Sequence, residues 1–312
     1  MRKLLGLFSI CALVGVAAGA NGAGATPPSG PPPDVKEYGR AQQVEGGKVI
    51  ASSGYDVQHT IYTLAPGGDT GWRNGPGSTT LALTKGALKI EQASGCATRA
   101  LTAGSAIVLP AGKFRLQNTD KEPAEILANF TNLPSGGGAP LDGEAGSAPD
   151  CAGFAAAAVA NGLSSDKTFR GDPTAYYNQV HAGHHGSDGY ASSEIPVEVD
   201  KDAVMMTFVL QPGFSTGWFA HTPHVAVLTK GSWAFFEARD GKCEKVEEYR
   251  AGDAWVHPVH RHMGAVQGNE PVEITVFGFN MNHGDPKPVL GSQPDHLDFF
   301  HAPPSECPTQ LR

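Results

Sequence analysis

The sequence predicts an all-β protein made of two tandem barrels, because it contains one long internal repeat and many strand-and-turn segments. The segment APGGDTGW at 65–72 returns as QPGFSTGW at 211–218, an offset of 146 residues. A repeat of this kind marks two structural units of the same plan. Within each copy, short β-branched or alternating runs are bounded by Gly, Pro, Asn or Asp, which is the pattern of strands joined by turns. Strands at this spacing favour a small barrel or jelly roll in each copy.

Residues 1–25 have the layout of a secretory signal peptide. Arg2 and Lys3 precede an apolar run of about a dozen residues, and small-residue cleavage sites follow. This run is short for a membrane span, although an uncleaved anchor is the alternative. The Pro-rich stretch at 26–38 is expected to be a linker. We therefore expect a secreted protein, periplasmic or otherwise extracytoplasmic.

Strand-like segments follow in the same order in both copies. In the first copy they are VQHTIYTLAPGG, LALTKGALKIEQASG, AIVLPAGKFRLQNTD and AEILANFTNLP. In the second they are VMMTFVLQPG, VAVLTKGSWAFFEARDG, AWVHPVHRHMGAVQGNE and VEITVFGFNMNHG. We expect a first barrel over 39–152 and a second over 184–312. Between them, 153–183 is expected to be a linker with a His/Gly-rich loop, and the alanines of 153–165 predict a short helix in it.

Composition excludes two broad classes of partner. The formal net charge is -8, so the chain has no basic footprint for nucleic acid or anionic lipid. The hydrophobic content of 40% supports packed cores. We expect no nucleic-acid partner and, once the signal peptide is removed, no membrane partner.

Four cysteines remain when Cys11 is removed with the signal peptide, an even number that suits an oxidising compartment. Four cysteines allow three pairings, and spacing alone does not choose among them. Each copy has one cysteine at a hairpin-like turn, Cys96 or Cys243, and one in its tail, Cys151 or Cys307. Because equivalent units should close in equivalent ways, the repeat favours the bridges Cys96–Cys151 and Cys243–Cys307.

The histidines lie almost entirely in the second copy, since eleven of the twelve stand at or beyond His181. The frame around them is a TGW segment, an apolar hairpin with a KG turn, and then G-x5-P, found in AGSAIVLP at 103–110 and AGDAWVHP at 251–258. This frame resembles the two motifs of the cupin superfamily, and it is similar to small secreted bacterial cupins that carry GWHxHPG. The resemblance covers about 40–140 and 185–307, and it implies two cupin-like jelly-roll barrels, a bicupin.

In the first copy, the resemblance places residues that cannot bind a metal at the ligand positions. Arg73, Gly75 and Arg115 stand where the family has histidines. None offers a lone pair, because guanidinium stays protonated and glycine has no side chain. The first barrel is therefore expected to be free of metal. Two inward guanidinium groups would instead favour a carboxylate or sulfate ligand.

In the second copy, the resemblance implies a metal site made of histidines. His221 falls on the first motif, and His224 stands just before the expected place of a glutamate ligand. His262 takes the histidine position of the second motif if one residue is deleted, whereas a gapless match places Met263, a poor ligand for hard metals, there. His260 shares a strand face with His262 and is either a fourth ligand or a neighbour of the ligands. This set would hold one divalent ion (Zn, Fe, Mn, Ni or Cu) with an open position.

The same histidines also fit ordinary hydrogen-bonded or surface positions in a cupin that has lost its metal. Phe219 replaces one of the family histidines, and no glutamate follows. His257 alternates out of phase with His262 and is expected to face outward. The group HAGHHG at 181–186 is expected to be a solvated loop.

Two functions of different classes follow from these observations. In the first, the second barrel binds one divalent ion and acts on a small organic molecule; the sequence does not separate dioxygenase, decarboxylase and isomerase types. In the second, the protein is a non-catalytic extracellular module that binds a small molecule without metal. Both imply a small-molecule ligand, and both leave a homo-oligomer open. No nucleotide fingerprint, phosphate loop or serine-triad motif is evident.

The cysteine pairing is directly testable. Peptide mapping of the non-reduced protein should recover one fragment joined by Cys96–Cys151 and another joined by Cys243–Cys307. Replacing Cys243 by Ser should lower the free energy of unfolding by roughly 2–5 kcal/mol, because the open loop regains conformational entropy in the unfolded chain. A bridge that joins a cysteine of one copy to a cysteine of the other would contradict the repeat-based pairing.

Overall fold

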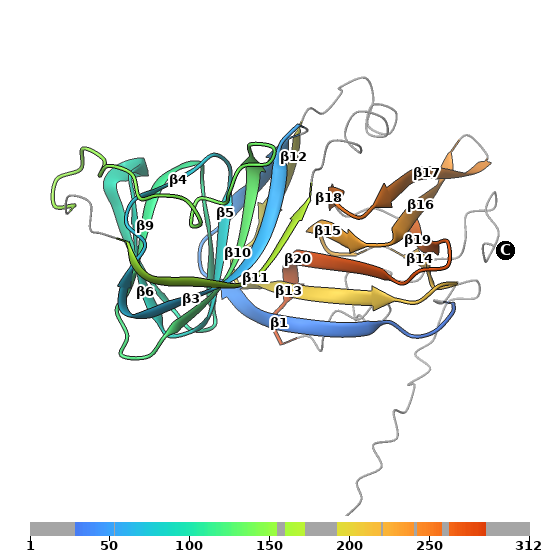
Figure 1. Cartoon of the computed structure of the whole chain (residues 1–312), viewed down its shortest axis with the longest axis horizontal. Coiled ribbons are helices and arrows are strands. Elements are labelled where there is room, and N and C mark those ends of the chain that lie inside the picture. Colours follow the sequence, from blue (N-terminus) through green and yellow to red (C-terminus); the bar gives the residue numbers. More distant parts are fainter. Residues whose placement is uncertain are drawn as a thin grey trace, which may run out of the picture.

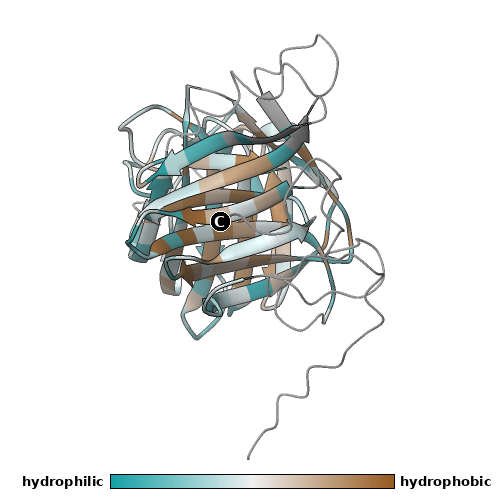
Figure 2. Ribbon diagram, turned by 90° about the vertical axis from the view of Figure 1, so that its right-hand side faces the viewer, coloured by the Kyte–Doolittle hydropathy of each residue, from teal (hydrophilic) through white to brown (hydrophobic). Residues whose placement is uncertain are grey.

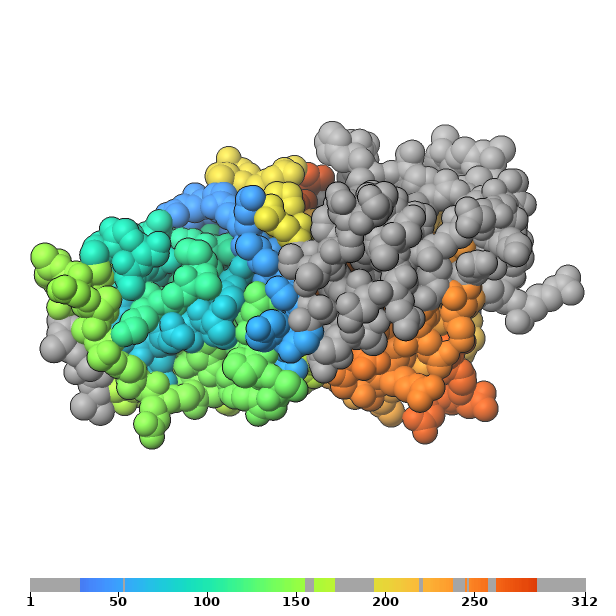
Figure 3. All heavy atoms as spheres, turned by 90° about the horizontal axis from the view of Figure 1, so that it is seen from above, coloured from blue at the N-terminus to red at the C-terminus, as the bar shows by residue number. Residues whose placement is uncertain are grey.

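The computed structural model describes residues 29–52, 54–154, 160–171, 192–219, 221–239, 242–257 and 262–284. These residues form β-strands and one short 3-10 turn, η1 at Ser94–Cys96, and they include no α-helix. Two β units lie side by side along the long axis of the molecule (Figures 1 and 3). The predicted all-β fold of two tandem jelly-roll-like barrels is thereby confirmed.

The first unit is built from nine strands that the turn residues of the first copy delimit. They are β2 Gly47–Ser52, β3 Asp56–Asp69, β4 Arg73–Gly75, β5 Thr79–Lys85, β6 Ala87–Gln92, β7 Ala97–Thr102, β8 Ser105–Leu109, β9 Gly112–Asn118 and β10 Ala124–Leu133. Alternate side chains of β3, β5, β6, β8, β9 and β10 point into one closed apolar core, which includes Tyr62, Leu81 and Phe114. The interior of this unit is therefore filled by hydrocarbon side chains.

The second unit consists of two sheets that face each other. Its strands are β13 Lys201–Leu210, β14 Ser215–Phe219, β15 His224–Lys230, β16 Ser232–Arg239, β17 Lys242–Arg250, β18 Ala254–His257, β19 His262–Gln267 and β20 Val272–Asn282. One sheet has the order β18-β15-β20-β13 and the other the order β14-β19-β16-β17. Seen from this end of the molecule, the strands are hydrophobic along their central stretches and hydrophilic at many ends and loops (Figure 2). Phe235 of one sheet and Trp255 of the other meet with ring centroids 5.7 Å apart.

Three further strands tie the units together. β1 (Asp34–Gln43) runs antiparallel to β13 of the second unit (Figure 1). Its last two residues pair in parallel with β8 of the first unit. β11 (Asn161–Gly171) runs antiparallel to β3 of the first unit and lies against β15 of the second, and β12 (Ser192–Val197) pairs with β2. Both the expected Pro-rich linker and the expected inter-barrel linker thus contribute strands to the sheets, while the division of the chain into domains stays a prediction.

The predicted helix over 153–165 is wrong where the structure describes it, because Asn161 to Ser165 belong to β11. Residues 155–159, which include the alanines at 155–158, lie outside the described residues. Helix propensity is a weak preference for so short a segment. The edge of β3 offers backbone partners from Asn161 to Gly171, with two register shifts, and this tertiary pairing decides the conformation.

The tail of the first copy is held to the β6–β7 hairpin by a disulfide. Cys96 and Cys151 form this bridge, with their Cα atoms 5.6 Å apart, as the repeat predicts. Cys307 lies outside the described residues, so the second predicted bridge stays a prediction. Within the described residues, no helix has the length and apolarity needed to cross a membrane.

A single apolar core continues from the outer face of the first barrel into the second unit, and it includes Ala82, Leu127 and Val204. His59 of β3 lies fully buried at this junction, with its ring 5.9 Å from that of Phe277. Burial lowers the pKa of His59 to about 3, and its neighbours, the Val225 backbone and the Asn129 side chain, offset only part of this effect. His59 is therefore neutral in the folded protein at ordinary pH.

This neutral histidine should make the protein sensitive to acid. Between pH 6.5 and about 3 the unfolded chain takes up a proton at His59 that the folded protein does not, so stability falls as pH decreases through this range. The full effect is on the order of 4–5 kcal/mol. Urea unfolding of the wild type and of His59→Gln, each measured from pH 7 to pH 4, should give curves that converge as pH decreases. Parallel curves would contradict the buried neutral state of His59.

Candidate metal centre

Four histidines meet in the second unit, at the ends of strands from both of its sheets. His221 precedes β15, His224 begins β15, His257 ends β18 and His262 begins β19. His224 lies directly opposite His257 in the β15–β18 ladder, and His262 lies opposite Phe219 in the β14–β19 ladder. Because the strand register fixes the backbone at each position, the cluster is held by the sheets.

The imidazole rings of this cluster are in mutual contact. Ring nitrogens of His221, His224 and His257 lie within 4.8 Å of one another. The centroid of the His262 ring is 4.8 Å from that of His221 and 5.0 Å from that of His257. His257 and His262 are fully buried, whereas His221 and His224 are half-buried. The sequence-predicted residues His221, His224 and His262 thus lie together inside the second barrel.

The expectation that His257 faces outward is wrong. It assumes that the alternation of His262 continues backward along one strand, but His257 ends β18 and His262 begins β19, which belong to different sheets. The period of two applies only within a strand. Opposing sheets direct both side chains into the same interior, and the His257 ring contacts His221 at 5.4 Å with an interplanar angle of 8°. The signal that could have found His257 is its position at the strand end just before Pro258.

The remaining candidate histidines are elsewhere or outside the described residues. His260, proposed as a fourth ligand or neighbour, lies outside them, as do His181, His184 and His185 of the loop segment. His283 is exposed at the end of β20 and pairs with Asp202 at 2.8 Å. The described cluster therefore consists of His221, His224, His257 and His262.

Aromatic rings form one wall of the cluster. The Phe235 ring lies 4.6 Å from the ring of His257 and 4.8 Å from that of His262. The Trp255 indole donates a hydrogen bond from Nε1 to Nε2 of His224 at 3.2 Å. The histidines therefore lie in an apolar interior, where an electrostatic interaction with an ion is stronger than in water.

The donor set fits a divalent metal ion. Imidazole nitrogens bind Zn²⁺ at about 2.0–2.1 Å, so ligand nitrogens around one ion lie roughly 3–3.5 Å apart. Ring nitrogens of His221, His224 and His257, which lie within 4.8 Å of one another, are near that spacing. All the donors in the cluster are imidazoles, which suit Zn, Cu, Fe and Ni better than they suit hard cations.

In the first unit, the two guanidinium groups for which an anionic ligand was expected have partners within the protein. Arg73 is buried, and its guanidinium donates to the backbone carbonyls of Thr70, at 2.6 Å, and Gly143. Arg115 projects from the face of β9 opposite to Phe114, so it does not point into the barrel interior. The expectation of two inward guanidinium groups is therefore wrong for Arg115.

Arg115 is instead the centre of a buried ion-pair network. Its Nε lies 2.9 Å from Oδ1 of Asp69, its Nη2 contacts Oδ2 of the same carboxylate, and its Nη1 lies 3.3 Å from Oε2 of Glu91. Burial alone would raise the pKa of Asp69, but hydrogen bonds from Arg115, Gly71 and Gln117 lower it below its ordinary value. The positive charge of Arg115 is already neutralised by the protein's own carboxylates.

Comparisons with known proteins give only a distant likeness. No protein-family model matches the chain, and no curated protein matches it. Among solved structures, the chain is similar to an oxalate decarboxylase variant from Bacillus subtilis at 13% identity and a TM-score of 0.33, over 80% of this chain and 78% of that one. A structure from work on the Mn(II) centres of oxalate decarboxylase from the same organism gives 13% identity and a TM-score of 0.33, over 81% and 78%. Likenesses of this size carry no argument about the site or the reaction.

The buried ion pair leads to a prediction about the first unit. Arg115→Met should lower the free energy of unfolding by about 3–5 kcal/mol, because it leaves the buried Asp69 carboxylate without its cation and leaves Glu91 with Lys89 alone. The matched control is Arg99→Met, which removes the half-exposed pair with Glu45 and should cost less than about 1 kcal/mol. Urea unfolding measures both variants. Equal costs would contradict the network, and loss of bound metal in folded Arg115→Met would contradict a metal-free first unit.

Proposed function

We propose that this protein is a secreted bicupin whose second barrel binds one divalent metal ion through histidines and acts on a small organic molecule. The observation that carries the proposal is the contact of four imidazoles from both sheets in one buried interior. The cupin assignment is supported by the two motif frames that recur in both copies. Secretion is supported by the sequence of 1–25.

A metal held by these histidines would supply Lewis acidity to a bound ligand. Neutral imidazoles balance none of the ion's charge, so a substrate atom that carries or develops negative charge would gain stabilisation from the ion. The residues of the chain hold and orient the donors: the Thr222 carbonyl lies 2.8 Å from Nδ1 of His221 and sets the orientation of that ring. The Phe235 and Trp255 rings exclude water from one side of the cluster and favour an organic substrate with an apolar body.

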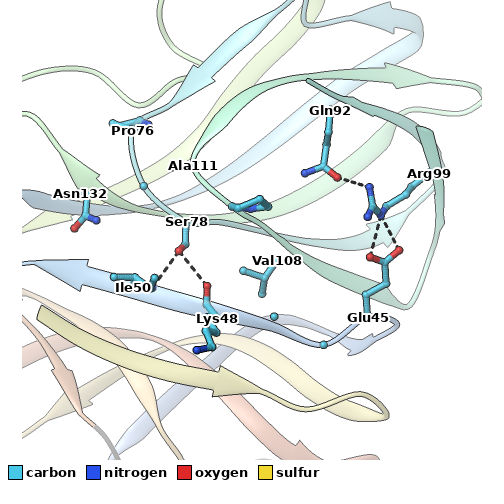
Figure 4. A pocket seen from close by; sticks show the side chains of 14 residues that line it. Glu45, Lys48, Ile50, Pro76, Ser78, Gln92, Arg99, Val108, Ala111 and Asn132 are labelled. Carbon is cyan, nitrogen blue, oxygen red and sulfur yellow. Dashed lines mark hydrogen bonds and ion pairs between the residues drawn. The ribbon is translucent and has the colours of Figure 1, made fainter. Parts of the chain in front are cut away.

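The alternative is a small-molecule-binding protein without metal, and one observation favours it. A pocket of ≈ 470 Å³ opens on the first unit beside β2, and Pro76 is among the residues that line it (Figure 4). Its walls are held by internal bonds: Ser78 Oγ donates to the Lys48 carbonyl at 3.1 Å, and Arg99 Nε donates to Glu45 at 2.7 Å. This volume lies within the range of small-molecule sites.

Metal analysis separates the two functions. Protein purified without a histidine tag and reconstituted with Zn²⁺, Fe²⁺, Mn²⁺, Ni²⁺ or Cu²⁺ should hold one ion per chain after desalting, with Mn²⁺ the weakest of the five because the donors are imidazoles. His221→Ala should abolish stoichiometric binding, because it removes a ligand from the centre of the cluster. His283→Ala is the matched control, since this exposed histidine lies outside the cluster, and it should bind as the wild type does.

Two results would contradict the proposal that the histidine cluster binds a metal ion. Wild-type protein that retains no ion after reconstitution with any of the five metals would favour the binding-module alternative. Equal loss of metal in His221→Ala and His283→Ala would show that binding occurs outside the cluster.

A further inference from the structure

One backbone carbonyl sets the protonation of two histidines in the cluster. The Thr222 carbonyl oxygen lies 2.8 Å from Nδ1 of His221 and 3.3 Å from Nδ1 of His224. A carbonyl oxygen only accepts hydrogen bonds, so both Nδ1 atoms carry the proton. In a neutral imidazole this arrangement leaves the lone pair, which is the metal-binding group, on Nε2 of each ring.

The Nε2 lone pair of His224 is already engaged by Trp255. The indole Nε1 lies 3.2 Å from Nε2 of His224. An indole N–H is only a donor, so His224 Nε2 is the acceptor, in agreement with the proton position set by Thr222. A ring nitrogen has one in-plane lone pair and cannot accept this hydrogen bond and bind a metal at the same time. His224 therefore has no lone pair for an ion while the bond to Trp255 persists.

Trp255 is held in place by the packed interior of the barrel. Its side chain is buried, and its ring centroid is 4.6 Å from that of Tyr249 and 5.7 Å from that of Phe235. Its backbone lies opposite Ala226 in the β15–β18 ladder, two residues from the His224–His257 pair. Withdrawal of the indole would require repacking of a dense core.

The other three histidines form a compact triangle. Ring centroids are 4.8 Å apart for His221 and His262, 5.0 Å for His257 and His262, and 5.4 Å for His221 and His257. We propose that the ion is held by these three residues, and that Trp255 is a positioning residue that keeps His224 outside the ligand set. This inference rests on the proposed metal-binding function. The centroid of the His224 ring lies 4.3 Å from that of His221, and a nitrogen of His224 lies within 4.8 Å of nitrogens of His221 and His257, but Nε2 of His224 accepts the hydrogen bond from Trp255.

Zn²⁺ affinity of single-site variants of the full chain tests the ligand set. In calorimetric titrations, His257→Ala and His262→Ala should each weaken Zn²⁺ binding more than about 100-fold. Loss of a metal ligand weakens binding more than loss of a residue that only contacts a ligand, which costs about 10–100-fold. His224→Ala should weaken binding less than about tenfold. A loss in His224→Ala equal to that in His257→Ala would overturn the inference.

The direction in which Trp255→Phe changes Zn²⁺ affinity separates two roles of Trp255: it either keeps His224 out of the ligand set or supports His224 as a ligand. If the indole keeps His224 away, its removal should leave Zn²⁺ affinity unchanged or raise it, because a fourth imidazole becomes available. If Trp255 instead supported a ligating His224, its removal would weaken binding by about 10–100-fold, which would overturn the inference. Trp233→Phe is the matched control, since Trp233 is equally buried and its indole nitrogen has no hydrogen-bond partner among the described residues.

The wild-type protein allows a test without substitution in the core. It contains four tryptophans, so NMR should show four indole N–H signals, and the variant Trp255→Phe identifies that of Trp255. Saturation with diamagnetic Zn²⁺ should leave this signal protected from hydrogen exchange. Loss of its protection would show that the ion recruits His224 and would overturn the inference alone. Absence of any Zn²⁺ binding to the wild type would instead reject the proposed function and, with it, this inference.

Discussion

The backbone pairing of β1 with β13 makes the two units one continuous structure, and the position of the histidine cluster depends on it. β1 precedes the first repeat, yet it connects β13 of the second unit to β8 of the first. Across the sheet, β13 pairs with β20, β20 pairs with β15, and β15 pairs with β18. The strands that present His224 and His257 are therefore fixed relative to the first barrel. The apolar core that spans the junction, with neutral His59 inside it, reinforces this attachment.

The two copies differ in the kind of polar group that they bury. In the first copy a guanidinium, that of Arg115, is buried, and burial of a charge requires a partner charge, which Asp69 and Glu91 supply. In the second copy the buried groups of the cluster are imidazoles, which can be neutral and need no counter-ion. The first unit therefore contains a buried ion-pair network, whereas the second contains a cluster of imidazoles.

The surroundings of the cluster decide how its donors can be used. The Thr222 carbonyl orients two rings, and Trp255 engages one of them from a packed position. Sites built on strands that packing holds in place are more precise than sites on loop tips. The four neighbouring histidines are thus not equivalent, because the indole of Trp255 engages Nε2 of His224.

The sequence by itself determined the all-β class, the two-unit plan, the Cys96–Cys151 bridge and the region of the histidine cluster, because repeats, turn residues and strand periodicity are local properties. It did not determine which strands pair. The residues from Asn161 onward became a strand because β3 offered an edge, against the helix preference of the alanines before them. His257 entered the cluster because β18 and β19 belong to opposing sheets, so alternation along the chain does not relate it to His262. Arg115 lies outside the first interior because Phe114 and Leu116, its neighbours on β9, point into the core. Only the tertiary structure decided these points, since strand pairing brings together residues whose relation no local pattern encodes.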